Sequence, residues 1–100
     1  MSIVGKWEIE KDWDVSGETQ IYRFKGSAKE GKVYVLLNKP HEIGTYRVLR
    51  KQVKILTRIG CDFEYIGNIE KNTIKAKVQV HIKGEGYYKG DVILRKINNS

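Results

Sequence analysis

The sequence is poor in residues that cross-link a chain or interrupt its strands. It contains a single proline and a single cysteine, Cys61, in 100 residues. One cysteine cannot form a disulfide within the chain, so nothing in the sequence indicates an oxidising compartment. The two histidines, His41 and His81, lie far apart and lack the paired spacing of zinc ligands. We therefore expect no metal ion and no cofactor.

Long hydrophobic runs are also missing. Residues 1–13 contain no apolar stretch of the length that a signal peptide needs. No segment approaches the roughly 20 apolar residues of a membrane-spanning helix. These absences predict a cytoplasmic protein that does not associate with a membrane.

The remaining composition is typical of one small globular domain. Hydrophobic residues make up 40% of the chain and charged residues 31%, which is not the composition of a disordered protein. The length fits a single domain, residues 1–100, with a modest core.

Hydrophobic and polar residues alternate with a period of two along almost the whole chain, as half-buried β-strands require. We expect eight such segments, at residues 4–13, 18–26, 31–38, 42–50, 52–59, 62–70, 73–83 and 87–97. The short connections leave no room for the crossovers that parallel strands need. The sequence therefore predicts an all-β fold, an eight-stranded antiparallel up-and-down (meander) barrel, because closure removes exposed strand edges.

The same alternation places many aromatic side chains inside the barrel: Trp7, Tyr22, Phe24, Tyr46, Phe63 and Tyr65. It also places Leu37 and Leu94 inside. Buried tyrosine hydroxyls need partners, and with Gln20 and Thr57 they could form the polar end of a pocket. They could equally bond to one another or to water, because small eight-stranded barrels are often filled by their own side chains.

At Gly5-Lys6-Trp7 the chain resembles the calycin superfamily, which includes lipocalins, fatty-acid-binding proteins and avidin-like barrels. In that group a Gly-x-Trp opens the first strand, and a basic residue of the last strand packs over the tryptophan ring. The resemblance implies a calycin-like barrel in which Arg95, with Lys96 as the alternate, lies over Trp7. That contact would join the first strand to the last and close the barrel, with Gly5, Trp7 and Arg95 as its residues.

Charge is unevenly distributed in this basic chain, whose formal net charge is +7. Residues 1–18 hold two lysines and five acidic residues, so the positive excess lies in the rest of the sequence. This positive excess would suit binding to an anionic partner. It is equally typical of the surface of an ordinary soluble protein. A basic row stands out on the seventh segment: Lys75, Lys77, His81 and Lys83.

Catalytic arrangements are not evident. Cys61 follows Gly60 in an expected turn with no neighbouring base. Asp12 and Asp14 are spaced by two on the outward face, where solvent keeps carboxyl pKa values ordinary. Related barrels can host isomerase or cyclase chemistry, but no acid–base pair can be named for it here. We predict that the protein is not an enzyme.

The sequence thus favours a non-enzymatic small-molecule binding barrel that holds a partly apolar or anionic ligand in the barrel mouth. Arg47 or Arg50 would meet a negative group. The aromatic ligand-binding residues would be Trp7, Tyr22, Phe24, Tyr46, Phe63, Tyr65 and Tyr88. The alternative is a basic interaction module, an inhibitor or adaptor, that binds an acidic protein surface or nucleic acid through its exterior. Outward apolar residues such as Leu56 and Ile66 would also suit packing into a homo-oligomer.

Overall fold

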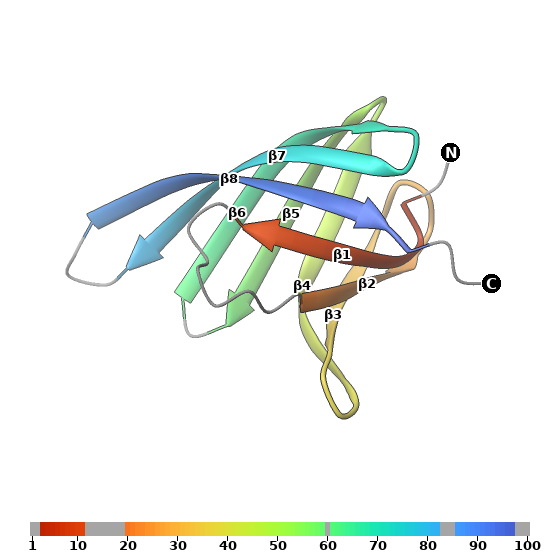
Figure 1. The fold of residues 1–100 in the computed structure, drawn as a ribbon, viewed down its shortest axis with the longest axis horizontal. Coiled ribbons are helices and arrows are strands. Elements are labelled where there is room, and N and C mark those ends of the chain that lie inside the picture. The colour runs from red at the N-terminus through yellow and green to blue at the C-terminus, as the bar shows by residue number, and fades with distance from the viewer. Residues whose placement is uncertain (1–2, 12–19, 60, 83–85, 98–100) are drawn as a thin grey trace.

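The computed structural model describes residues 3–11, 20–59, 61–82 and 86–97. These residues form eight strands: β1 (Gly5–Lys11), β2 (Gln20–Gly26), β3 (Glu30–Leu36), β4 (Pro40–Leu49), β5 (Gln52–Ile59), β6 (Cys61–Glu70), β7 (Thr73–Ile82) and β8 (Gly86–Lys96). Each strand pairs antiparallel with the next, and β8 returns to pair with β1, which closes the barrel (Figure 1). The predicted eight-stranded up-and-down barrel is confirmed. The described residues include no helix long and apolar enough to cross a membrane.

Alternate connections of the meander lie at the same end of the barrel. The two chain termini share one end with the β2–β3, β4–β5 and β6–β7 turns, and we call it the terminal end (Figure 1). The β3–β4 turn and the junction of β5 with β6 lie at the other end, called the opposite end. This division matters because the candidate site residues separate between the two ends.

Inward side chains fill the barrel as the alternation requires. On β7, Ile74 and Val78 are fully buried, whereas Lys75 and Lys77 are exposed. A slip of one residue would bury lysines, so the hydrophobic pattern fixes the register. Burying one large apolar side chain stabilises the fold by about 1.5–3 kcal/mol. The largest fully buried side chains are Trp7, Tyr22, Tyr65 and Phe24.

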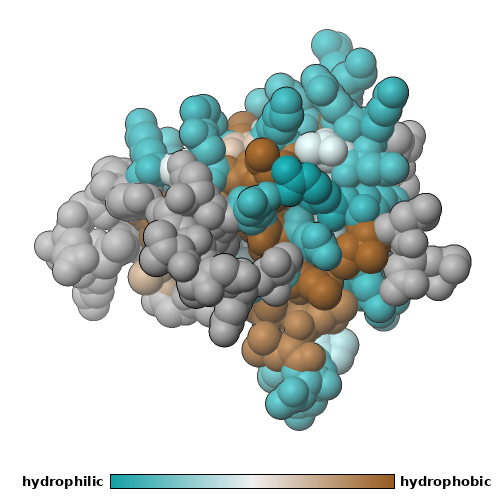
Figure 2. Space-filling view, in the orientation of Figure 1, coloured by the Kyte–Doolittle hydropathy of each residue, from teal (hydrophilic) through white to brown (hydrophobic). Residues whose placement is uncertain are grey.

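The inward placement of Leu37 is wrong. Strand β3 ends at Leu36, and Leu37 lies in the following turn with 68% of its surface exposed. Alternation assigns faces only while the chain remains in the sheet. Figure 2 shows hydrophobic surface gathered over the lower strands of this view, whereas hydrophilic side chains cover much of the upper part.

The N-terminal residues cover the terminal end. Ile3 is 1% exposed although it precedes β1, and its carbonyl oxygen accepts a hydrogen bond of 2.8 Å from Trp7 Nε1. Backbone hydrogen bonds continue the strand pairing around this end. The donor amides and acceptor carbonyl oxygens are those of Val48 and Lys29, Ile69 and Lys51, Lys96 and Asn72, and Ile97 and Lys6. The terminal end is therefore sealed by an isoleucine and held by its turns.

A bulge in β4 shapes the opposite end. Val33 pairs with Gly44 and Tyr34 with Glu42, so Ile43 is an extra residue between them. A Cβ atom on Gly44 would collide with the carbonyl oxygen of Leu56, so this close approach of β4 to β5 needs glycine. Ile43 consequently packs against the core beside β5.

Candidate functional site

The predicted aromatic residues form two layers inside the barrel, and the first lies near the terminal end. Phe24 packs edge-on against Trp7 and Tyr46, with ring centroids 6.2 Å and 5.4 Å away. The Tyr46 hydroxyl donates a hydrogen bond to the Ser27 carbonyl oxygen. A Cβ atom on Gly31 would come within 2.7 Å of the Tyr46 ring, so the ring lies directly on this glycine. This layer is densely packed, and its hydroxyl has a partner.

The second layer lies toward the opposite end and carries unpaired hydroxyls. Phe63 and Tyr65 stack with centroids 6.2 Å apart and an interplanar angle of 12°. The Tyr22 hydroxyl donates to Gln20 Oε1 over a long 3.4 Å. The Tyr65 hydroxyl and Thr57 Oγ1 are buried, and neither has a hydrogen-bond partner among the described residues. The hydrogen-bonding capacity of these two buried groups is therefore not satisfied by the described residues.

Burial makes both tyrosines of this layer harder to ionise. Burial raises the pKa of Tyr22 well above that of a free tyrosine, and the nearby Tyr65 raises it further. Burial also raises the pKa of Tyr65, and the neighbouring Tyr22 and Thr57 hydroxyls partly oppose that rise. The three hydroxyls are thus close to one another, although Tyr65 and Thr57 lack good hydrogen-bond geometry. At neutral pH they act as uncharged donors and acceptors.

A cavity of about 370 Å³ opens beside this layer. Ile43, Thr57 and Phe63 line it from the core side, and Leu56, Glu64 and Gln79 line it from the outer face. Arg58 and Asp62 stand at its edge and bond to each other, with 2.7 Å between Nε and Oδ1. On β2, Tyr22 lies two residues further from the opposite end than Gln20. On β6, Tyr65 lies two residues further from that end than Phe63. The cavity therefore combines apolar contacts with charged side chains at its edge, and the Tyr65 hydroxyl lies deeper in the barrel, outside its lining.

The chemistry of this site suits binding. Apart from the tyrosines, Thr57 is the one buried polar side chain among the described residues, so no buried carboxylate or imidazole accompanies it there. Hydroxyls with raised pKa values are poor general acids and bases near neutral pH. The site can orient a ligand by hydrogen bonds.

The two arginines expected to meet an anion lie at the terminal end. Arg47 is on the outer face of β4 and pairs with Glu30 across 3.9 Å. Arg50 is the first residue of the two-residue β4–β5 turn. The structure therefore does not bring either arginine to the Phe63–Tyr65 layer. Tyr88 lies on β8 opposite Val80, and its side chain falls outside the described residues.

The residue over the Trp7 ring is Lys96, so the placement of Arg95 there is wrong. Lys96 Nζ lies 5.9 Å from the ring centroid, whereas Arg95 points outward and forms an ion pair with Glu10 of β1. Leu94 is buried, so alternation turns Arg95 away from the interior and Lys96 back toward it. Gly5 lies beside the Lys96 side chain, and a Cβ atom there would come within 3.1 Å of Lys96 Cε.

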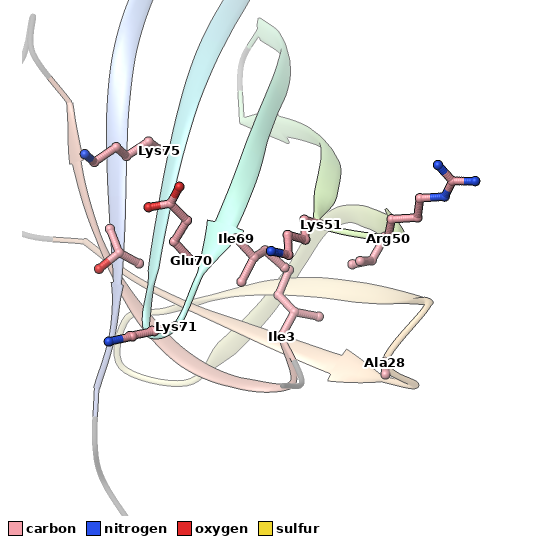
Figure 3. A pocket seen from close by; sticks show the side chains of 10 residues that line it. Ile3, Ala28, Arg50, Lys51, Ile69, Glu70, Lys71 and Lys75 are labelled. Atoms are coloured by element: carbon pink, nitrogen blue, oxygen red, sulfur yellow. The ribbon is translucent and has the colours of Figure 1, made fainter.

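A second pocket, of about 790 Å³, lies on the outside of the terminal end, and we call it the terminal pocket (Figure 3). Four aliphatic side chains contribute to it: Ile3, Ala28, Val48 and Ile69. Four basic side chains contribute as well: Arg50, Lys51, Lys71 and Lys75. In Figure 3, Lys51 and Ile69 lie beside Ile3, Lys71 and Lys75 lie on one side, and Arg50 extends away.

The structure describes the side chains of two members of the predicted basic row on β7, Lys75 and Lys77, and both are exposed. Lys75 contributes to the terminal pocket, whereas Lys77 pairs with Asp91 of β8 at 2.7 Å. His81 pairs with Tyr87 in the backbone ladder, but its side chain lies outside the described residues. Lys83 lies outside them altogether.

Sequence reasoning missed Ile3, Lys51 and Lys71 as members of a site. A signal for the two lysines was present, because every second turn of a meander lies at the same end. That rule groups the β4–β5 and β6–β7 turns with the chain termini. Nothing in the pattern shows that Ile3 folds over the barrel, since it lies before the first strand.

Metal ligands do not gather in the described part of the chain, where no three His, Cys, Asp or Glu residues are placed to hold an ion. Comparisons with protein-family models, with curated proteins and with solved structures found no match. Function is therefore argued from the residues themselves.

Proposed function

We propose that this protein is a non-enzymatic, calycin-like binding barrel that holds a small, partly apolar molecule at its opposite end. The buried hydroxyls of Thr57 and Tyr65 carry the proposal, because neither has a hydrogen-bond partner among the described residues. A buried polar group without a partner costs about 1–3 kcal/mol. A ligand that hydrogen-bonds to both hydroxyls would offset that cost.

The surroundings define the class of ligand. Phe63 and Ile43 offer apolar contact, and a cavity of about 370 Å³ is in the range used by small organic ligands. The hydroxyls are neutral, and Arg58 at the edge is already paired with Asp62. The site therefore favours an uncharged polar group, such as a carbonyl or an alcohol, attached to a flat or branched hydrocarbon.

The calycin-like part of the proposal is supported at the terminal end. Gly5 and Trp7 open β1, and Lys96 of the last strand lies over the Trp7 ring, where the resemblance requires a basic residue. The up-and-down strand order and the closed barrel agree with it.

The test uses benzamide and benzyl alcohol as neutral probes, titrated into isotopically labelled protein and followed by amide NMR shifts. We expect saturable shifts at Thr57, Phe63 and Tyr65. Thr57→Val and Tyr65→Phe should each weaken binding about three- to tenfold, the value of one hydrogen bond of 0.5–1.5 kcal/mol.

Tyr46→Phe is the matched control, because its hydroxyl is bonded to Ser27 in the other aromatic layer. It should leave probe affinity unchanged. Equal losses in Tyr46→Phe and Tyr65→Phe, or shifts confined to the outer wall, would refute the assignment of the site.

A further inference from the structure

The terminal pocket brings together four basic side chains that have no carboxylate partner among the described residues. Six basic side chains elsewhere have carboxylate partners on a neighbouring strand: Lys32, Arg47, Lys54, Arg58, Lys77 and Arg95. Arg50, Lys51, Lys71 and Lys75 form no ion pair with any described residue, and Glu70 is the one acid in the pocket lining. This end therefore presents a local excess of positive charge.

The floor of the terminal pocket is apolar. Ile3 is almost fully buried over Trp7, and Val48 and Ile69 are half-buried beside it. Figure 3 shows Ile3 and Ile69 close together, with the Lys51 side chain over them. A partner here can place an apolar side chain on the floor while its negative groups meet the ammonium groups.

Two of the four basic residues occupy backbone conformations that side chains disfavour. Arg50 has φ 62° and Lys71 has φ 55°, both in the left-handed region. A side chain there brings Cβ close to the following carbonyl oxygen, which strains the backbone, and glycine is the usual occupant of such turns. The two tightest turns of this end thus carry long cationic side chains where glycine would be less strained.

From these features we propose that the terminal pocket binds an acidic polypeptide segment of a partner protein through one apolar anchor residue flanked by carboxylates. The concave shape is unsuited to a flat lipid surface. The lining includes no aromatic residue on which nucleic-acid bases could stack. The pocket, at about 790 Å³, is larger than a single phosphate group would fill. Its apolar floor and surrounding lysines suit an apolar anchor side chain with charged neighbours.

The probe is a fluorescein-labelled peptide with the sequence Glu-Asp-Glu-Leu-Asp-Glu-Asp, measured by fluorescence anisotropy. We expect saturable binding that weakens as sodium chloride rises from about 0.05 M to about 0.5 M, because salt screens exposed charges. Replacing the leucine by serine should weaken binding, since the floor is apolar. Replacing Lys51, Lys71 and Lys75 together by Gln should weaken binding about tenfold or more, because three attractions to the peptide carboxylates are lost.

The matched control replaces Arg23, Lys39 and Lys89 by Gln, which removes the same charge from exposed residues outside this pocket. It should change the affinity less than about threefold, because distant exposed charges are screened. Equal losses in the two triple variants would refute the site, and so would equal binding of the serine peptide. Tighter binding of oligo-deoxythymidine, or of phosphatidylserine vesicles, with the same dependence on Lys51, Lys71 and Lys75 would overturn the choice of partner.

This inference stands apart from the proposed function. The terminal pocket and the Thr57–Tyr65 hydroxyls lie at different ends of the barrel. Thr57→Val and Tyr65→Phe should therefore leave peptide affinity unchanged, and the lysine triple should leave benzamide affinity unchanged. Failure of one experiment does not decide the other.

Discussion

At the scale of single residues, the barrel interior contains two hydroxyls that weaken the fold. Thr57 and Tyr65 are buried without hydrogen-bond partners in the described structure, whereas the buried Tyr46 hydroxyl is bonded to Ser27. A core selected for stability alone would use valine and phenylalanine at the first two positions. Retained buried polarity of this kind is typical of sites where stability is exchanged for binding.

We predict that Thr57→Val raises the free energy of unfolding by about 1 kcal/mol, because it removes an unpaired hydroxyl and keeps the side-chain volume. Urea denaturation of the ligand-free protein measures the change. Tyr46→Phe, which removes a bonded hydroxyl, should instead lower stability by about 1 kcal/mol. A loss of stability in Thr57→Val would mean that its hydroxyl has a partner such as bound water, and would remove the main support for the proposed ligand.

Residue faces were largely predictable, and the errors have physical causes. Alternation correctly buried Trp7, Tyr22, Phe24, Tyr46 and Tyr65, and left Phe63 half-buried, because a barrel strand has one face toward solvent and one toward the core. It failed for Leu37, which lies past the end of β3. The choice of Arg95 over Lys96 came from the resemblance, although the inward placement of Leu94 already indicated Lys96.

At the scale of elements, the sequence located all eight strands to within a few residues. The boundary between β4 and β5 lacks a glycine or proline signal, yet the turn falls at Arg50-Lys51 because Arg50 adopts a left-handed φ of 62°. The bulge at Ile43 and the folding of Ile3 over the barrel were not predictable, because both depend on contacts between segments distant in the sequence. These two features shape the cavity and the terminal pocket.

The pairing of β1 with β8, which closes the barrel, gives a prediction at this scale. Ile3→Ala should cost about 2–4 kcal/mol, because it opens a cavity over Trp7 in a buried site. Arg95→Ala should cost less than about 1 kcal/mol, since its ion pair with Glu10 is solvent-exposed. Urea denaturation of both variants compares them directly. If Arg95→Ala were the more damaging change, the exposed ion pair and not the apolar cover would hold the barrel closed.

At the scale of the whole molecule, the barrel is a chain of hairpins with one long-range pairing. Every neighbouring pair of strands is consecutive in sequence except β1 with β8. The termini lie at the same end, where the Ile97 amide bonds to the Lys6 carbonyl oxygen at 2.9 Å. Joining the termini would therefore make every pairing local.

We predict that a circular permutant folds to the same barrel when a short Gly-Ser linker joins the termini and the chain opens at Asn38. The β3–β4 turn tolerates opening because Leu37, Asn38 and Lys39 are exposed and lie at the end away from the terminal pocket. Opening between Arg50 and Lys51 should be more damaging, since the Lys51 carbonyl oxygen accepts a bond from the Ile69 amide and the turn contributes to the pocket. Far-UV circular dichroism and urea denaturation measure the fold and stability of both permutants. Fluorescence anisotropy with the acidic peptide should show that the first permutant retains binding and that the second binds more weakly. An unfolded first permutant would mean that the β3–β4 hairpin must be intact for the barrel to form.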